Sequence, residues 1–248
     1  MIALITGASS GLGKDFAIEL SKQGYDLVLV ARNKKELEKV KKLCITKCDI
    51  EVMDLSILAN CTKLFKKYKN IDLLINNAGF GLFGEFNNTD LEKEINMIDL
   101  NISALHILTK LYLNQMVKKD SGRILNVASS AAFLPGPLMS TYYATKAYVF
   151  RLTTAIYEEL RKTNSNVKIS VLCPGPVKTN FNNVANVNFS IKGLESEYVV
   201  KYALKKFFKD KLVIIPGLLT KIGAIASKFA PIKLAMKIDY NIQKKKEK

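Results

Sequence analysis

Residues 1–31 read MIALITGASSGLGKDFAIELSKQGYDLVLVA, and this stretch decides the fold. The apolar residues 1–6 predict a buried strand, and the glycine-rich turn at residues 7–13 leads into a helix that ends near Gly24. Residues 25–31 form a second apolar run, of the continuous kind that buried parallel strands show. A strand, a helix and a second strand in this order predict a β-α-β unit with a right-handed crossover.

The same alternation of strands and helices continues along the chain. Five further strands are expected at residues 50–53, 71–75, 123–127, 167–172 and 212–215. We therefore predict one α/β domain over residues 1–248, a doubly wound sheet of seven parallel strands with helices on both faces. Residues 180–248 would supply its substrate-side segment and an amphipathic C-terminal tail. In such sheets ligands bind beyond the carboxyl ends of the strands.

The composition fits one globular domain and excludes several classes of function. Of the 248 residues, 48% are hydrophobic, which is enough for a large core. The net charge of +16 comes from lysines scattered over all the expected helices, so no nucleic-acid surface is predicted. The four cysteines form no C-x-x-C pair and no cluster with histidine, so no metal site is expected. Reduced thiols, the lack of a signal-peptide n-region and the lack of a membrane-length apolar run favour a cytoplasmic location.

The turn after the first strand has the features of a dinucleotide site. Gly7, Gly11 and Gly13 permit a tight turn, so a pyrophosphate can approach the N-terminus of the following helix. At the end of the second strand, a carboxylate would bind the ribose 2′-hydroxyl of NAD, but this chain has Arg32. Its guanidinium suits a 2′-phosphate, with Ser9 or Ser10 assisting, and this predicts NADP(H) over NAD(H).

A tyrosine and a lysine share one face of a later helix. Residues 142–146 read YYATK within a helix expected from about Ser140, and Tyr142 and Lys146 lie one turn apart. The ammonium group is expected to lower the pKa of Tyr142 from about 10 toward neutrality, as a general acid or base requires. Ser129 follows the strand that precedes this helix, where its hydroxyl would reach the same substrate oxygen.

These motifs share their order and spacing with one family. T-G-x-x-x-G-x-G, N-N-A-G, Y-x-x-x-K and P-G-x-x-x-T stand at residues 6–13, 76–79, 142–146 and 174–179. Ser129 precedes Tyr142 by 13 positions. Over nearly its whole length the chain resembles the short-chain dehydrogenases/reductases. The stretch NVASSAAFLPGP that contains Ser129 resembles a bacterial branch of generic oxidoreductases.

The resemblance implies a Rossmann-type, NADP-dependent enzyme of class EC 1.1.1, which moves hydride between nicotinamide and a carbonyl or secondary alcohol. In this family pattern Tyr142 is the general acid or base, and Lys146 lowers its pKa and holds the nicotinamide ribose. Ser129 orients the carbonyl, and Asn101 anchors a water that returns the proton. The implied assembly is a homo-dimer or tetramer.

The turn, the second strand and the resemblance together predict the cofactor site. The resemblance assigns Asp54 to the adenine amino group and residues 174–179 to the carboxamide side. The predicted cofactor-binding residues are Gly7, Ser9, Ser10, Gly11, Leu12, Gly13, Arg32, Asp54, Leu55, Asn77, Ala78, Gly79, Tyr142, Lys146, Pro174, Gly175, Val177 and Thr179.

The substrate side is less defined by the sequence. The expected pocket walls suggest an apolar or mixed substrate and consist of Phe83, Phe86, Phe133, Leu134, Leu138, Met139 and Phe181. From Gly217 an apolar stripe of Leu218, Ile222, Ile225 and Phe229 forms a basic amphipathic helix that Pro231 ends or kinks. This segment would cover the pocket, pack on another subunit or lie on a membrane surface, in that order of preference.

Three alternatives remain at this stage. A 3-oxoacyl-thioester reductase would share the whole architecture. A non-catalytic dinucleotide sensor is disfavoured, because all four positions of the catalytic tetrad are filled. A nucleic-acid-binding role would rest on the charge alone. A Ser-His-Asp hydrolase finds no support, since the single histidine, His106, lies inside an expected helix.

Overall fold

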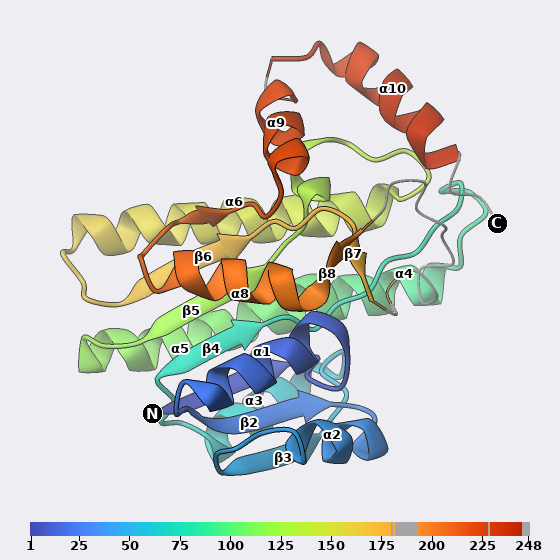
Figure 1. Ribbon diagram of the computed structural model, residues 1–248. Helices are drawn as coiled ribbons and strands as arrows, with labels where there is room; N and C mark the ends of the chain where they lie inside the picture. Colours follow the sequence, from blue (N-terminus) through green and yellow to red (C-terminus); the bar gives the residue numbers. More distant parts are fainter. Residues whose placement is uncertain (180, 182–192, 228, 245–248) are drawn as a thin grey trace.

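The computed structural model describes residues 1–179, 181, 193–227 and 229–244. Its main sheet has seven parallel strands in the order β3-β2-β1-β4-β5-β6-β9 (Figure 1). The strands are β1 (Ile2–Thr6), β2 (Asp26–Ala31), β3 (Cys48–Val52), β4 (Leu73–Asn76), β5 (Arg123–Val127), β6 (Lys168–Leu172) and β9 (Val213–Ile214). The predicted seven-stranded parallel sheet is confirmed, and the order reverses direction between β1 and β4.

Helices cover both faces of this sheet, as predicted. One face packs against the helices α1 (Gly11–Lys22), α2 (Lys34–Lys41) and α8 (Ser196–Phe207), with Ile5 of β1 pointing into this layer. The other face packs against α3 (Leu58–Lys67), α5 (Leu105–Lys119) and α6 (Ser140–Lys162), with the neighbouring Leu4 pointing there. Because successive side chains of a strand point to opposite faces, a strand buried on both sides reads as a continuous apolar run.

The sequence pattern of residues 89–118 predicts a long helical region with a break near residues 97–100, and the structure has three helical segments there. Helix α4 (Leu91–Ile98) passes into a π-helical turn, η1 (Asp99–Ala104), and then into α5. The wider turn replaces the expected break and places Asn101 inside the protein. Such π-turns occur often at functional sites.

The C-terminal part contains two short strands that the sequence analysis did not predict, and it contains the helix predicted from Gly217. Two-residue strands β7 (Val177–Lys178) and β8 (Leu194–Glu195) pair in parallel. Pro231 separates two helices, α9 (Leu218–Ala226) and α10 (Ile232–Lys244), which project from the body of the molecule (Figure 1). The 3-10 turn η2 (Ser130–Phe133) follows β5. The predicted substrate-side segment starts at residue 180, and its residues 180 and 182–192 lie outside the described part.

In the described part of the chain, no helix has the combination of length and apolar character that crossing a bilayer requires.

Candidate active site

A cavity of about 670 Å³ opens at the carboxyl ends of the strands. Its size falls within the range of about 300–1,000 Å³ that is typical of small-molecule sites. Residues that follow β1, β2, β3, β4, β5 and β6 all contribute to it. Among the predicted site residues, the cavity is lined by Gly7, Ser9, Ser10, Gly11, Leu12, Arg32, Asp54, Leu55, Asn77, Ala78, Gly79, Ser129, Tyr142, Lys146, Pro174, Gly175, Val177 and Thr179.

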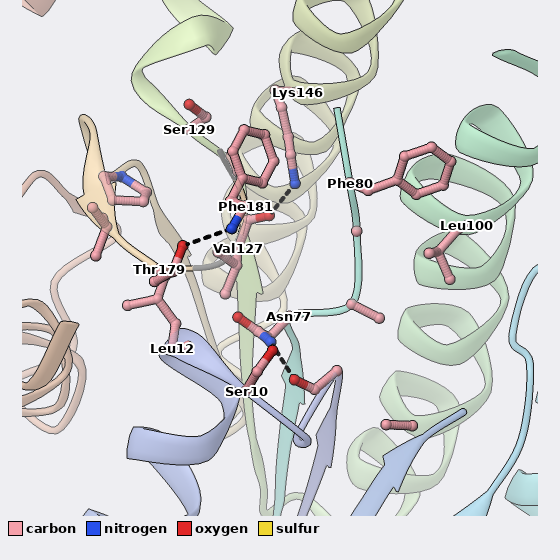
Figure 2. A pocket seen from close by; sticks show the side chains of 18 of the residues that line it. Ser10, Leu12, Asn77, Phe80, Leu100, Val127, Ser129, Lys146, Thr179 and Phe181 are labelled. Carbon is pink, nitrogen blue, oxygen red and sulfur yellow. Dashed lines mark hydrogen bonds between the residues drawn. The ribbon is translucent and has the colours of Figure 1, made fainter. Parts of the chain in front are cut away.

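The glycine turn after β1 is held by side chains from the neighbouring strand β4. Gly7 and Gly11 have positive φ angles of 65° and 52°, which favour glycine. The Asn77 side chain donates to the carbonyl oxygens of Thr6 and Gly7 at 3.0 and 3.3 Å. The Thr6 hydroxyl in turn accepts the backbone N–H groups of Asn77 and Ala78, each at 3.0 Å. Asn77 therefore fixes the turn as well as lining the cavity (Figure 2).

Gly13 contributes to this turn in a different way. It does not line the cavity, although it belongs to the predicted cofactor residues. A Cβ atom at this position would lie 2.2 Å from the carbonyl oxygen of Gly7. Gly13 therefore allows α1 to approach the turn closely instead of contacting a ligand.

Arg32 and Asp54 form one edge of the cavity. The Arg32 side chain is largely exposed, and its Nη1 lies 3.5 Å from Oδ2 of Asp54. The Asp54 carboxylate also accepts the backbone N–H and the hydroxyl of Ser56 at 2.9 and 2.7 Å. Burial alone raises the pKa of Asp54, but these hydrogen bonds and the Arg32 charge bring it below its usual value. Both groups are thus charged at neutral pH, with the guanidinium at the cavity edge.

Tyr142 and Lys146 lie together on α6 in the interior of the cleft. They are 8% and 6% exposed, and the Lys146 Nζ lies 5.8 Å from the centre of the Tyr142 ring. The ammonium donates to the carbonyl oxygen of Val127 at 3.0 Å, which anchors it to the end of β5 (Figure 2). Burial lowers the pKa of Lys146 to about 8.

The pKa of Tyr142 differs from the expectation. We predicted that Lys146 would lower it, but burial dominates and raises it to about 12, while a hydrogen bond with the Ser129 side chain acts in the opposite direction. The expectation was wrong because the sequence shows the spacing of the two residues but not their desolvation. Tyr142 is therefore a protonated phenol at neutral pH.

Asn101 lies next to these residues but does not line the cavity. Its Nδ2 donates to the Phe80 carbonyl at 2.9 Å and to the Thr145 hydroxyl at 3.1 Å, and its Oδ1 accepts the Phe80 N–H at 3.1 Å. A Cβ atom on Gly79 would lie 2.8 Å from this Oδ1 and 3.4 Å from the Lys146 Nζ. Asn101 therefore fixes the strand-end loop at Phe80 and stands beside Lys146.

An apolar wall lies over the Tyr142 ring. Phe181 packs against it with ring centres 5.4 Å apart, and Met139 and Ala131 belong to the same buried cluster. Of the predicted wall residues, only Met139 and Phe181 line the cavity, while Phe83 packs beside this cluster. The predictions for Phe86, Phe133, Leu134 and Leu138 were wrong. Phe86 is 67% exposed, Phe133 packs on Phe150, and the two leucines lie outside the lining.

Comparisons with known proteins identify the family of the chain. The model of the family described as short chain dehydrogenase matches residues 1–188. The chain belongs to the short-chain dehydrogenase/reductase family. It is therefore an oxidoreductase of that family.

Among relatives of this short-chain dehydrogenase, an uncharacterized oxidoreductase of Staphylococcus epidermidis is 34% identical over 183 residues, which cover 72% of this chain and 78% of the relative. The very-long-chain 3-oxoacyl-CoA reductase of Homo sapiens is 33% identical over 169 residues, 64% of this chain and 54% of the relative, so the chain spans about half of that protein. The solved structure of a short-chain dehydrogenase from Sphingobium yanoikuyae in complex with NADPH superposes with a TM-score of 0.83 at 30% identity and covers 92% of this chain and 93% of the other.

The sequence analysis of this short-chain dehydrogenase missed several lining residues. They are Val30, Ala31, Asn33, Glu36, Met53, Leu100, Val127, Ala128, Ser130 and Tyr143. Most are direct neighbours of a predicted residue at a strand end, so the position of the strand ends was a usable signal. Leu100 and Tyr143 reach the cavity from helical segments, and no local pattern marks them. Within the described ranges, no group of three or more His, Cys, Asp or Glu side chains is placed to hold a metal ion.

Proposed function

We propose that the chain is an NADP(H)-dependent oxidoreductase that transfers hydride between nicotinamide and a carbonyl or secondary alcohol, with Tyr142 as general acid and base. The observation that carries the proposal is the length of one cavity, whose lining includes Arg32 and Ser129. Arg32 follows β2 and Ser129 follows β5, and two strands, β1 and β4, lie between these in the sheet. At a spacing of about 4.8 Å between strands, the cavity is long enough to receive a dinucleotide lengthwise.

The residues present fit such a cofactor. No side chain caps the N-terminus of α1 at Ser10, and its first turn has no acidic residue, so its N–H groups suit a pyrophosphate. A Cβ atom on Gly7 would lie 2.9 Å from the Ala78 Cα, and one on Gly11 would meet the Thr179 side chain. Glycine at these two positions therefore keeps the turn free for a ligand. The permanently charged Arg32 supports a 2′-phosphate and hence NADP(H). When bound, the nicotinamide supplies or accepts the hydride.

The chain's own residues handle the proton. In the reduction direction the protonated Tyr142 donates its proton to the carbonyl oxygen as that oxygen gains negative charge. The Ser129 hydroxyl offers a second hydrogen bond to the same oxygen and stabilises the phenolate that remains. Lys146, held by the Val127 carbonyl, adds a positive charge close to that phenolate. Alcohol oxidation would use the same groups in reverse.

The substrate class follows from the apolar wall. Met139, Phe181 and Phe80 surround the Tyr142 side of the cavity and support an apolar or mixed carbonyl compound. A 3-oxoacyl thioester is the second candidate, favoured by the similarity to the human very-long-chain 3-oxoacyl-CoA reductase.

We further propose a reducing compartment such as the cytoplasm, supported by four free thiols, and a homo-dimer or tetramer. For the assembly, the exposed apolar side chains of Ile95, Val117 and Tyr148 on α4, α5 and α6 offer a surface for a second copy.

A substrate panel tests the proposed reaction. Oxidation of NADPH and of NADH is followed by absorbance with ketones, aldehydes and 3-oxoacyl thioesters. We expect turnover with at least one class and a higher kcat/KM for NADPH than for NADH. Binding of NADPH without turnover on the whole panel would contradict the enzymatic proposal and favour a dinucleotide sensor. Faster turnover with NADH would contradict the role given to Arg32.

A further inference from the structure

Helix α9 contacts the protein through small residues and exposes its large apolar residues to solvent. Ala224 is buried, and Thr220 packs against the backbone of Gly175, where an added Cβ atom would lie 2.5 Å from the Thr220 Oγ1. The outward residues are 51–82% exposed and are Leu218, Leu219, Ile222 and Ile225. Phe229, which follows the helix, is also 82% exposed.

Helix α10 has the same inverted arrangement. Its buried stripe is Ala235, Asp239 and Gln243, spaced four residues apart, and the Gln243 amide donates to the Tyr143 hydroxyl. The adjacent stripe, one residue earlier at each step, is exposed and consists of Leu234, Ile238 and Ile242. Because a helix turns by about 100° per residue, these two stripes are neighbouring faces of one helix. The helix therefore buries a stripe of one alanine and two polar residues and exposes a stripe of large apolar residues.

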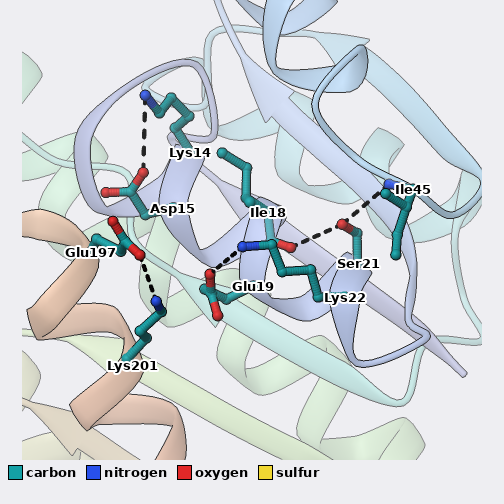
Figure 3. Close-up of polar contacts among 9 residues, drawn as sticks. All are labelled: Lys14, Asp15, Ile18, Glu19, Ser21, Lys22, Ile45, Glu197 and Lys201. Atoms are coloured by element: carbon teal, nitrogen blue, oxygen red, sulfur yellow. Dashed lines mark hydrogen bonds and ion pairs between the residues drawn. The ribbon is translucent and has the colours of Figure 1, made fainter.

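Other helices of the same molecule show the usual arrangement. Helix α8 buries Val199, Val200 and Phe207 and exposes an ion pair between Glu197 and Lys201. Helix α1 likewise carries the Glu19–Lys22 pair at its surface (Figure 3). Of these four helices, α9 and α10 are thus the two that expose their large apolar residues. Large exposed apolar surfaces mark interaction sites.

The charges around this surface indicate the kind of partner. Lys221, Lys233, Lys237 and Lys244 are exposed beside the apolar stripes. Between residues 218 and 244 the sequence has one acidic residue, Asp239, and it is buried. In a two-fold pair of identical chains the same patch would face itself, so these lysines would repel each other. An anionic partner with an apolar interior satisfies both features.

We propose that α9 and α10 form a docking surface for an anionic lipid bilayer. The outward leucine, isoleucine and phenylalanine side chains enter the boundary between headgroups and acyl chains, and the lysines contact the lipid phosphates. Long lysine side chains reach the headgroup level while their stems lie on apolar surface. Thr220 and Gln243 contact Gly175 and Tyr143, two lining residues, so the docking surface adjoins the cleft.

Flotation of the full chain with vesicles tests this proposal without any measurement of catalysis. Vesicles of pure phosphatidylcholine are compared with vesicles that contain phosphatidylglycerol. The test variant is Ile222→Glu/Ile238→Glu, which changes two exposed residues of the docking surface. The matched control is Ile45→Glu/Ile57→Glu, which makes the same charge change at two isoleucines elsewhere that are at least as exposed. Circular dichroism verifies that both variants are folded.

We expect the wild type and the control to float with the anionic vesicles, less so at high salt, and the test variant to bind about tenfold less. Failure of the wild type to bind anionic vesicles overturns the proposal. Equal losses in both variants also overturn it, since net charge and not the docking surface would then explain the binding. Sedimentation velocity without lipid adds a third outcome. A dimer that the test variant dissociates and the control does not would assign the surface to a second copy.

Discussion

Burial shifts the pKa values of Tyr142 and Lys146 in opposite directions. The phenol has a raised pKa of about 12 and the ammonium a lowered one of about 8, and desolvation is the main cause in both cases. At neutral pH both groups are therefore protonated. This state suits proton donation to a carbonyl oxygen, with a positive charge already in place beside the phenolate that forms.

Lys146 should be the group that limits activity at high pH. Below pH 8 its ammonium is charged, and above that value the charge is lost, whereas Tyr142 keeps its proton until about pH 12. We therefore expect kcat/KM for carbonyl reduction to be level up to about pH 7 and to fall as the pH rises through about 8. A pH profile checks this, with Lys146→Arg as control because arginine does not titrate there. An inflection that persists in this variant would assign it to another group.

Arg32 should discriminate between the two dinucleotides. Loss of its guanidinium in Arg32→Ala removes a partly exposed, charge-assisted contact, so we expect the Kd for NADPH to rise about tenfold and the Kd for NADH to stay unchanged. Lys35→Ala is the control, because it removes the same charge from an exposed position outside the cavity lining. Titration calorimetry gives both constants. Equal weakening by the two variants would show a general charge effect in place of a specific phosphate contact.

At the level of elements, the turn between β1 and α1 depends on close packing that only glycine permits. The positions of Gly7, Gly11 and Gly13 were predictable from the sequence, since their order and placement after a strand are specific. The different structural roles of these three glycines were not predictable from the sequence. The close approach of Gly13 to the Gly7 carbonyl depends on the angle at which α1 leaves the turn, and no local pattern encodes that angle.

Substitution of Gly13 should therefore affect stability. Gly13→Ala places a methyl group 2.2 Å from a backbone oxygen, and we expect a loss of about 1–3 kcal/mol in the free energy of unfolding. Gly223→Ala is the matched control, because it is also a helical glycine but a Cβ atom there has no neighbour within 4 Å. That variant should be neutral or stabilised by up to about 1 kcal/mol. Urea denaturation compares them, and equal stabilities would refute the packing role of Gly13.

The π-helical turn η1 is an element that the apolar pattern of the sequence does not predict. The sequence indicated a helix with a break at residues 97–100, because a wider helical turn and a true break disturb the apolar period in the same way. In the structure the turn continues the helix and points Asn101 toward Phe80 and Thr145. Asn101 could be named from the family pattern, but its hydrogen-bond partners depend on this turn and so required the structure.

At the level of the whole molecule, one sheet brings together residues from six strand ends, and the sequence predicted this gathering well. Parallel strands end at one edge of the sheet, so motifs such as Asn77, Ser129 and Pro174 had to meet there. The apolar wall was predicted poorly. Phe133 and Phe181 both lie in segments for which the sequence pattern predicts neither a strand nor a helix. Only the long-range packing decides that Phe181 covers Tyr142 while Phe133 joins Phe150.

The C-terminal helices carry the proposed docking surface for lipid. The amphipathic pattern from Gly217 was visible in the sequence, but a pattern does not show which of its faces is buried. In the structure Ala224 and Ala235 are buried, and the large apolar residues of both helices are exposed to solvent. A cleft with an apolar wall and an adjoining docking surface for lipid together suggest a carbonyl substrate that partitions into membranes, and this rests on both proposals.

Proton donation by Tyr142 is the step on which the proposed reaction depends. The most direct test measures the kcat of NADPH-dependent carbonyl reduction for wild type, Tyr142→Phe and Tyr148→Phe, together with the Kd of each for NADPH. Tyr148 is a matched control on the same helix, since its hydroxyl contacts His106 outside the cavity. We predict a fall in kcat of about 10²- to 10⁴-fold for Tyr142→Phe, with NADPH binding retained and Tyr148→Phe unchanged. A Tyr142→Phe variant that keeps its kcat would contradict the account.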